Sequence, residues 1–312
     1  MTAPPFLYER AFARNIGWLN ESEQQLLRRK RIAIAGLGGV GGVHLLTLTR
    51  LGIGAFHLAD FDRFSLENFN RQTGAAMSTI GLEKTAVMAQ MARDINPQLK
   101  LSIYNEGVTE ENVRAFLSGV DLYVDGLDFF SVAAREMTFR VCDEMRIPAI
   151  TAAPLGMGAA LLTFMPGRTT FERYFRLSGC NEKEKLRRFL VGLSPALLQR
   201  RYLVDPRSVD LDAGHGPSTS MACQLCAGMA GTEALKVLLG RGRIYAAPWS
   251  TQFDAYRHKL VRTWRPGGNR HPMQRIVLAV ARRQLERGKT QRAPKPSAHT
   301  APAAPARKLF RG

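Results

Sequence analysis

The chain has 312 residues, 45% of them hydrophobic, and a formal net charge of +18. This length and composition are enough to bury a core, so we exclude a wholly disordered chain. Residues 266–312 hold eleven Lys and Arg but a single acid, Glu286. Because so much of the charge lies in this last segment, the net charge says little about nucleic-acid binding by the rest of the chain.

Strand-like and helical segments alternate along the first half of the chain. The expected strands are 31–36, 55–62, 100–108, 120–128 and 148–154. The expected helices are 20–30, 40–52, 81–96, 110–119 and 131–146. This alternation predicts βαβ units and an α/β fold, with a Rossmann-like, doubly wound and mainly parallel sheet. Strand-like runs within 147–167 and 244–264 have no helix between their strands, so we expect them to add antiparallel strands.

The second half of the chain divides by composition. Residues 168–217 read as a charged, helical crossover insert within a body that spans residues 1–265, and 218–239 reads as a helix. Residues 266–288 are predicted to contain a basic amphipathic helix. Residues 289–312 are rich in Ala, Pro and basic side chains and predict a disordered basic tail.

Cellular location is predicted from the cysteines and from the apolar runs. Four cysteines in so long a chain, with no apolar signal peptide in its first 31 residues, predict reduced thiols and a cytoplasmic protein. Residues 147–167 are broken by prolines and glycines, and 213–232 is polar at its start, so we expect no membrane span.

A glycine-rich turn, "AGLGGVGG" (35–42), lies between the first strand and the helix after it. Gly36, Gly38 and Gly41 satisfy G-x-G-x-x-G, and Asp60 ends the next strand. Such glycines let a backbone approach phosphate at a helix N-terminus, while the acid accepts hydrogen bonds from ribose. NAD(H) and ATP fit these features equally well.

Polar residues after Asp60 distinguish the two ligands. Asn68, Arg71 and Lys84 follow in "LENFNRQ" and "GLEK", and Asp128 is expected at the end of the fourth strand. Arg71 and Lys84 could meet the β- and γ-phosphates of a triphosphate, and a carboxylate at Asp128 suits Mg²⁺. Asp125 is a second candidate for the metal. These residues favour ATP over a dinucleotide.

The joint pattern "AGLGGVGG…LADFDRFSLENFNRQ…GLEK…DINP…DLYVDGLD" resembles the E1-like (ubiquitin-activating, ThiF/MoeB/HesA) superfamily of adenylyltransferases. The resemblance is strong over residues 31–166 and looser over 8–30 and 215–262. It includes enzymes that activate sulfur-carrier proteins and, in the branch with "NxNRQ", the tRNA threonylcarbamoyladenosine dehydratase. Gln72 belongs to the pattern, but the sequence assigns it no contact.

The resemblance implies an E1-like ATP-binding adenylation domain over residues 1–265. It also implies that MgATP is bound by Gly39, Asp60, Asn68, Arg71, Lys84 and Asp128, with the metal at Asp128. A carboxylate would attack the α-phosphate, pyrophosphate would leave, and Arg71, Lys84 and Mg²⁺ would stabilise the developing charge. Relatives of this kind form homodimers in which an arginine reaches the partner's site. Arg14, or less favourably Arg10, is the candidate here, and an ordinary surface arginine is an equal alternative.

The cysteines suggest two further questions. Many members of the superfamily bind structural zinc through two C-x-x-C pairs, but Cys223 and Cys226 form only one pair here, so we do not expect zinc. We expect both to be small buried residues of a packed helix. Cys180 lies in the charged insert, where some relatives place a thioester- or persulfide-forming cysteine; an incidental loop cysteine is the alternative.

Two functions therefore remain. The first is activation of the C-terminal carboxylate of a small ubiquitin-like or sulfur-carrier protein as an acyl adenylate. The second is a tRNA-modifying ATPase of the dehydratase type that uses the same ATP site. An NAD-dependent oxidoreductase would leave Arg71, Lys84 and Asp128 without a role. The basic tail could contact tRNA or an acidic partner, but it has no interleaved aromatic residues for base stacking.

Overall fold

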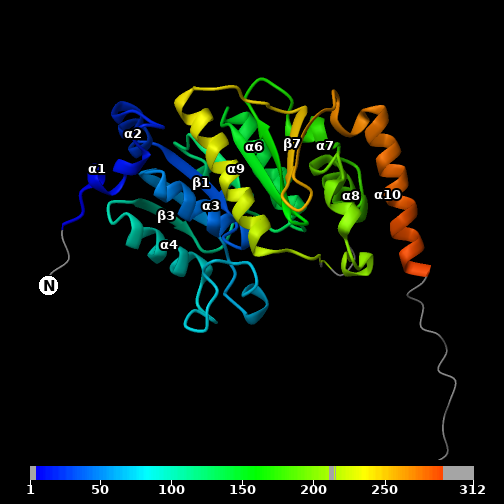
Figure 1. Ribbon diagram of the computed structural model, residues 1–312, viewed down its shortest axis with the longest axis horizontal. Coiled ribbons are helices and arrows are strands. Elements are labelled where there is room, and N and C mark those ends of the chain that lie inside the picture. Colours follow the sequence, from blue (N-terminus) through cyan, green and yellow to red (C-terminus); the bar gives the residue numbers. More distant parts are fainter. Residues whose placement is uncertain (1–4, 211–213, 215, 291–312) are drawn as a thin grey trace, which may run out of the picture.

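The computed structural model describes residues 5–210, 214 and 216–290. Its centre is an eight-stranded sheet in the order β3-β2-β1-β4-β5-β6-β7-β8 (Figure 1). In chain order the strands are β1 (Arg31–Ala35), β2 (Ala55–Ala59), β3 (Lys100–Tyr104), β4 (Leu122–Asp125), β5 (Ala149–Leu155), β6 (Gly158–Phe164), β7 (Trp249–Asp254) and β8 (Lys259–Trp264).

The sheet is flanked by helices that come mainly from the crossovers. The α-helices are α1 (Tyr8–Ala11), α2 (Glu21–Arg28), α3 (Gly39–Arg50), α4 (Lys84–Ile95), α5 (Val113–Phe116), α6 (Val132–Glu144), α7 (Phe171–Phe175), α8 (Glu182–Leu193), α9 (Ser220–Leu239) and α10 (Pro272–Thr290). The short 3-10 helices are η1 (Ala13–Asn15), η2 (Leu66–Asn68), η3 (Leu198–Tyr202), η4 (Pro206–Ser208) and η5 (Gly268–Arg270).

The pairing of neighbouring strands changes once across the sheet, from parallel to antiparallel. From β3 to β5 all neighbours are parallel. From β5 to β8 all neighbours are antiparallel; β5–β6 and β7–β8 are hairpins, whereas β6 and β7 are joined by the long segment that contains α7, α8 and α9. The predicted α/β fold, mainly parallel with added antiparallel strands, is confirmed. No helix in the described part of the chain is long and apolar enough to cross a membrane.

Two buried clusters lie on the two faces of the parallel strands. Ile32 and Ile34 of β1 pack on one face with Leu48 of α3, in a cluster that also includes α4 and α9. Ala33 and Ala35 belong to the cluster on the other face, with α5, α6, α7 and α8. Figure 1 shows α3, α4 and α9 together on the near face. Burial on both faces explains why β1 is a continuous apolar run.

The strands predicted over 55–62 and 100–108 end earlier than expected, at Ala59 and Tyr104, and so does the fourth strand. The strand assigned to residues 120–128 ends at Asp125, and Asp128 lies in the following loop. Gly126 packs against the glycine turn so closely that a Cβ there would lie 2.7 Å from Gly41 Cα. The chain turns away at this contact, so Asp128 is not a strand residue, although it stays at the same edge of the sheet.

Helix ends follow local capping chemistry. α2 begins after Asn20, whose side chain accepts from Glu23 N–H in a capping box. The helix expected over 110–119 is reduced to the single turn of α5. The basic amphipathic helix is α10, and residues 291–312 of the predicted tail lie outside the described residues.

Candidate active site

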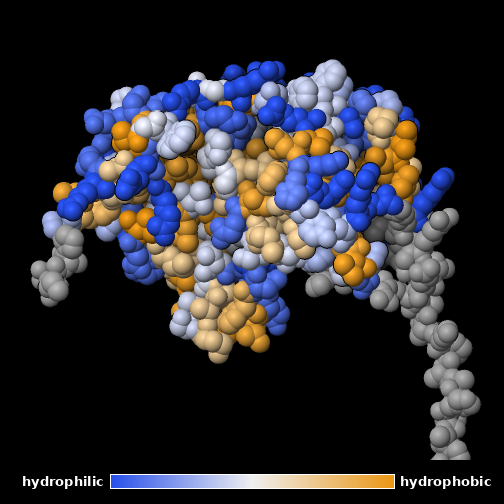
Figure 2. Space-filling view, viewed as in Figure 1, coloured by the Kyte–Doolittle hydropathy of each residue, from blue (hydrophilic) through white to orange (hydrophobic). Residues whose placement is uncertain are grey.

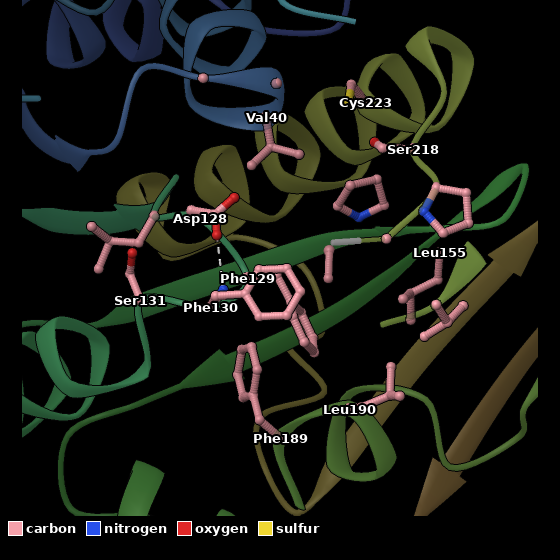
Figure 3. A pocket seen from close by; sticks show the side chains of 18 of the residues that line it. Val40, Asp128, Phe129, Phe130, Ser131, Leu155, Phe189, Leu190, Ser218 and Cys223 are labelled. Atoms are coloured by element: carbon pink, nitrogen blue, oxygen red, sulfur yellow. Dashed lines mark hydrogen bonds between the residues drawn. The ribbon is translucent and has the colours of Figure 1, made fainter. Parts of the chain in front are cut away.

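A cavity of about 1720 Å³ opens at the carboxyl ends of β1, β2, β4 and β5. This is the edge at which open α/β sheets bind their ligands. One part of the lining is polar and comes from the glycine turn and residues 60–72. The other part is largely apolar and comes from the loop after β4, the β5–β6 turn, α8, η3 and α10. The two parts meet near Asp128, above Phe129, Phe130 and Phe189 (Figure 3).

The glycines of the turn have two different roles. Gly36 has φ +81°, and a Cβ on it or on Gly41 would overlap neighbouring backbone, so the close packing of β1, α3 and β4 requires both. Gly38 and Gly39 face the cavity instead. A Cβ on Gly38 would lie 3.5 Å from Gln72 Nε2, and one on Gly39 would lie 3.2 Å from Cys223 Sγ. Because α3 begins at Gly39, its unpaired N–H groups provide an anion site in the cavity wall.

Asp60 connects this turn to the next segment. One carboxylate oxygen accepts from Leu37 N–H at 2.6 Å, and the other accepts from Asp62 N–H at 2.8 Å. Burial raises the pKa of Asp60, and these two hydrogen bonds together with Lys84 oppose the rise. Each oxygen has a second lone pair, so the carboxylate could still accept from a ribose hydroxyl.

The segment after β2 holds Arg71 in place through one backbone and one side-chain acceptor of its own. Arg71 Nη1 donates to Glu67 O at 3.0 Å and to Asn70 Oδ1 at 2.9 Å, which leaves other guanidinium donors for a ligand. Asn70 Nδ2 in turn donates to Ser218 O, next to α9. Asn68 caps the turn by accepting from Ser65 N–H at 3.1 Å. The loop is therefore tied at both ends before any ligand binds.

Gln72 and Lys84 lie deeper than the sequence indicates. Gln72 is 7% exposed and lines the cavity beside Gly38, and its Oε1 has no hydrogen-bond partner. Lys84 is 5% exposed at the start of α4, with its Nζ 2.9 Å from Asp62 Oδ2. A buried carbonyl oxygen without a partner is costly, which makes Gln72 a candidate ligand contact that the sequence left unassigned.

Asp128 and Asp125 both line the cavity, but Asp128 is exposed whereas Asp125 is almost fully buried. Asp128 Oδ1 accepts from Phe130 N–H at 2.9 Å (Figure 3). Asp125 is 2% exposed and accepts from Arg135 Nε at 2.7 Å and from Thr151 Oγ1 at 2.8 Å. Its carboxylate is already neutralised, so Asp128 fits a metal and Asp125 does not.

The cysteine predictions have separate outcomes. Cys223 and Cys226 are buried on α9, as predicted, and burial raises the pKa of both thiols. Among the described residues no cluster of three or more His, Cys, Asp or Glu could hold a metal. Cys180 is half-buried before α8, and its Sγ lies 3.7 Å from Arg176 O. The described lining of the cavity does not include it, so its role as a nucleophile stays a prediction.

Of the residues predicted to bind MgATP, the cavity brings together Gly36, Gly38, Gly39, Asp60, Asn68, Arg71, Lys84 and Asp128. Arg14 of the same chain lies on η1 outside this lining, and its reach into a partner's site stays a prediction. Three features were missed. They are the unpaired oxygen of Gln72, the hydrogen bonds from Arg135 to the loop after β4, and the phenylalanine-rich half of the cavity. Gln72 belongs to the sequence pattern, but no short-range pattern in the sequence marks the other two.

Comparison with known proteins connects this site to a family. The model of the ThiF family matches residues 12–275. The chain is 35% identical over 137 residues to the tRNA threonylcarbamoyladenosine dehydratase of Escherichia coli strain K12, which is 44% of this chain and 50% of that protein. It is 31% identical over 143 residues to the sulfur carrier protein ThiS adenylyltransferase of the same strain, which is 46% of this chain and 56% of that protein. The chain thus spans about half the length of these curated relatives.

Solved structures match a larger share of the chain. PaaA superposes with a TM-score of 0.62 at 14% identity, covering 85% of this chain and 77% of PaaA. E. coli MccB with ATP gives 0.60 at 18% identity, covering 83% and 73%. E. coli tRNA N6-threonylcarbamoyladenosine dehydratase gives 0.56 at 23% identity, covering 74% and 95%. At these identities the matches establish the shared fold.

Proposed function

Because the chain belongs to the ThiF family, we propose that it is an ATP-dependent adenylyltransferase. An oxygen of a substrate carboxylate attacks the α-phosphorus of ATP, the bond from that phosphorus to the β-bridging oxygen breaks, and pyrophosphate leaves with an acyl adenylate formed. The observation that carries the proposal is one cavity in which a glycine turn at a helix N-terminus faces Arg71, Lys84 and Asp128.

The residues of the polar half fit a triphosphate. The N–H groups at the start of α3 and the cations Arg71 and Lys84 supply donors and positive charge for phosphate oxygens. Asp60 would orient the ribose, and Asn68 and Gln72 offer further polar contacts. Asp128 would hold Mg²⁺, which neutralises phosphate charge when bound. Such a site works mainly by positioning and by electrostatic stabilisation.

For the substrate we propose first the C-terminal carboxylate of a small ubiquitin-like or sulfur-carrier protein. Relatives named as sulfur carrier protein ThiS adenylyltransferase and molybdopterin-synthase adenylyltransferase support it, at 31% and 29% identity. The largely apolar half of the cavity leads away from Asp128 and gives a chain terminus a route to the phosphates. We also propose a cytoplasmic homodimer in which Arg14 reaches the partner's site.

The second candidate is a tRNA-modifying ATPase of the dehydratase type on the same ATP site. Relatives with that name from three bacteria are 31 to 35% identical to this chain. The chemistry at phosphorus would be the same, because a nucleoside-borne carbonyl oxygen or carboxylate replaces the protein carboxylate.

Calorimetric ATP binding and ATP–pyrophosphate exchange test the shared step. Arg71→Ala and Asp128→Ala should abolish exchange and leave the thermal unfolding curve unchanged. Arg93→Ala and Asp94→Ala are matched controls, since both residues are exposed on α4 outside the cavity lining. Exchange that requires a small β-grasp protein supports the first substrate, and exchange that requires tRNA supports the second. Near-native exchange by either site variant, or NADH binding without ATP binding, would contradict the site assignment.

A further inference from the structure

The β7–β8 hairpin forms one edge of the sheet and is covered on one face only. On the covered face, Gln252 Nε2 donates to Ser194 Oγ at 3.0 Å, and Asp254 Oδ2 accepts from Tyr202 Oη at 2.8 Å. The residues between these point the other way. There Trp249 lies opposite Trp264, and further along the hairpin Leu260 is 58% exposed. The outward face is therefore open to solvent.

Aromatic rings and guanidinium groups interleave on this open face. The guanidinium carbons of Arg243 and Arg262 lie 4.7 Å and 4.4 Å from the ring centre of Tyr245. Arg262 Nη1 also donates to Tyr245 Oη at 3.3 Å. The ring of Trp249 lies 5.7 Å from Tyr245 and 6.2 Å from Trp264, and Trp264 is 54% exposed. We call this set the β7–β8 face and define it as Arg243, Tyr245, Trp249, Leu260, Arg262 and Trp264.

The charge of this segment is strongly one-sided. Residues 241–265 contain six Lys and Arg and one acid, Asp254, which is buried. Among the described residues, Arg241 forms an ion pair with Glu23 at 3.3 Å, and no other cation of this segment pairs with a carboxylate. In Figure 1 the chain from α9 to β7 runs along the upper margin of the molecule, and Figure 2 shows strongly hydrophilic residues there, with hydrophobic ones beside β7.

We propose that the β7–β8 face binds an unpaired segment of single-stranded nucleic acid. Bases stack on Trp264 and on the outer side of the Arg262–Tyr245 pair, and phosphates contact the guanidinium groups of Arg243 and Arg262. Exposed aromatic rings among unpaired cations are the chemistry that recognises unstacked bases on a charged backbone. An acidic polypeptide would use the cations alone and would gain little from an exposed indole. The proposal does not depend on adenylation, because no residue of this face belongs to the described cavity lining.

Fluorescence anisotropy of the full chain tests the proposal. The probes are labelled oligouridylate and oligothymidylate, each longer than the roughly 4–16 nucleotides of one binding site. Trp264→Ala should raise Kd about 5- to 150-fold, the loss expected for one stacked base. Arg262→Ala should raise Kd and lower the slope of log K against log salt by about 0.7. Either oligomer binding this way supports the proposal, and tighter binding of the ribonucleotide identifies RNA.

Controls separate this face from bulk charge. Arg93→Ala removes an exposed arginine on α4 and should leave Kd within twofold, while the basic tail is present in every variant. Trp264→Phe should retain most of the affinity, and the thermal unfolding curve shows whether Trp264→Ala is folded. Equal effects of Arg93→Ala and Arg262→Ala would overturn the proposal. So would polyglutamate binding with the same response to Trp264→Ala, which indicates an acidic protein partner. A dimer lost in Trp264→Ala without a change in Kd would instead identify an interface between copies.

Discussion

Replacing Arg135 should test how the fold holds Asp128 in place. Arg135 is 2% exposed on α6, and its Nε donates to buried Asp125 at 2.7 Å. Its Nη2 donates to Leu127 O at 2.7 Å and to Asp128 O at 3.1 Å. The guanidinium therefore both neutralises a buried carboxylate and ties down the loop that presents Asp128 to the cavity.

The expected cost of Arg135→Met follows from this burial. Removing one partner of a buried ion pair leaves an unpaired charge and costs roughly 3–5 kcal/mol. At ~2–4 °C per kcal/mol, the range for domains of 150–250 residues, the melting temperature should fall by ~6–20 °C. Arg140→Ala on the same helix breaks only exposed pairs with Glu110 and Glu144 and should cost ~0–1 kcal/mol.

Two assays check the reasoning, differential scanning calorimetry for stability and ATP–pyrophosphate exchange for the loop. Arg135→Lys keeps a charge but loses the fork of donors, so we expect partial stability with a higher KM for ATP. Arg135→Met with Asp125→Asn should recover part of the lost stability, because the unpaired charge is removed. If Arg135→Met has the same melting temperature as Arg140→Ala, or if Arg135→Met with Asp125→Asn recovers no stability, the buried contacts of Arg135 do not hold the loop in place as argued.

Three further predictions rest on single contacts. Gly39→Ala places a methyl group 3.2 Å from Cys223 Sγ and should weaken ATP binding, whereas Gly39→Ala with Cys223→Ala should bind more tightly than Gly39→Ala alone in the same calorimetric titration. Cys180→Ala should leave exchange within twofold of the wild type, since Cys180 is outside the described lining of the cavity; loss of exchange would assign it to adenylation. His44 has no hydrogen bond to either ring nitrogen, and burial lowers its pKa to about 4 from 6.5. The unfolded state therefore binds the proton first as pH falls, so ~3 kcal/mol of stability present above pH ~6.5 should be lost between pH ~6.5 and ~4. Denaturant melts of His44→Leu should lose this part of the pH dependence, and an unchanged slope would contradict the assignment.

The fold was predictable where one physical rule acts alone. Alternation of apolar strands with helices of ten to sixteen residues gave β1 to β5, because parallel strands buried on both faces read as apolar runs. The error at the end of β4 has a different origin. It depends on Gly126 meeting Gly41 across the sheet, and that close backbone contact joins residues 85 positions apart.

The residues of the candidate site also divide into those that the sequence predicts and those that only the folded structure shows. Gly36, Arg71 and Lys84 could be placed at one site from the sequence because each lies near the carboxyl end of a predicted strand, and the described cavity lining contains all three. The sequence pattern includes Gln72 but predicts no contact for it, because only the folded structure shows that its side-chain oxygen is buried without a hydrogen-bond partner. Arg135 gave no signal at all, since an arginine inside a helix is ordinarily a surface residue.

The β7–β8 face provides a way to separate the two proposed substrates. Its residues and those of the described cavity lining do not overlap, so a variant of one surface leaves the chemical groups of the other intact. Binding energy from a remote part of a substrate lowers the KM for that substrate and not the KM for ATP. If the substrate is a nucleic acid bound at this face, Trp264→Ala should raise its KM in the exchange assay while the KM for ATP stays constant. If the substrate is a carrier protein, Trp264→Ala should lower the affinity for oligouridylate but leave the KM for the carrier protein in the exchange assay unchanged.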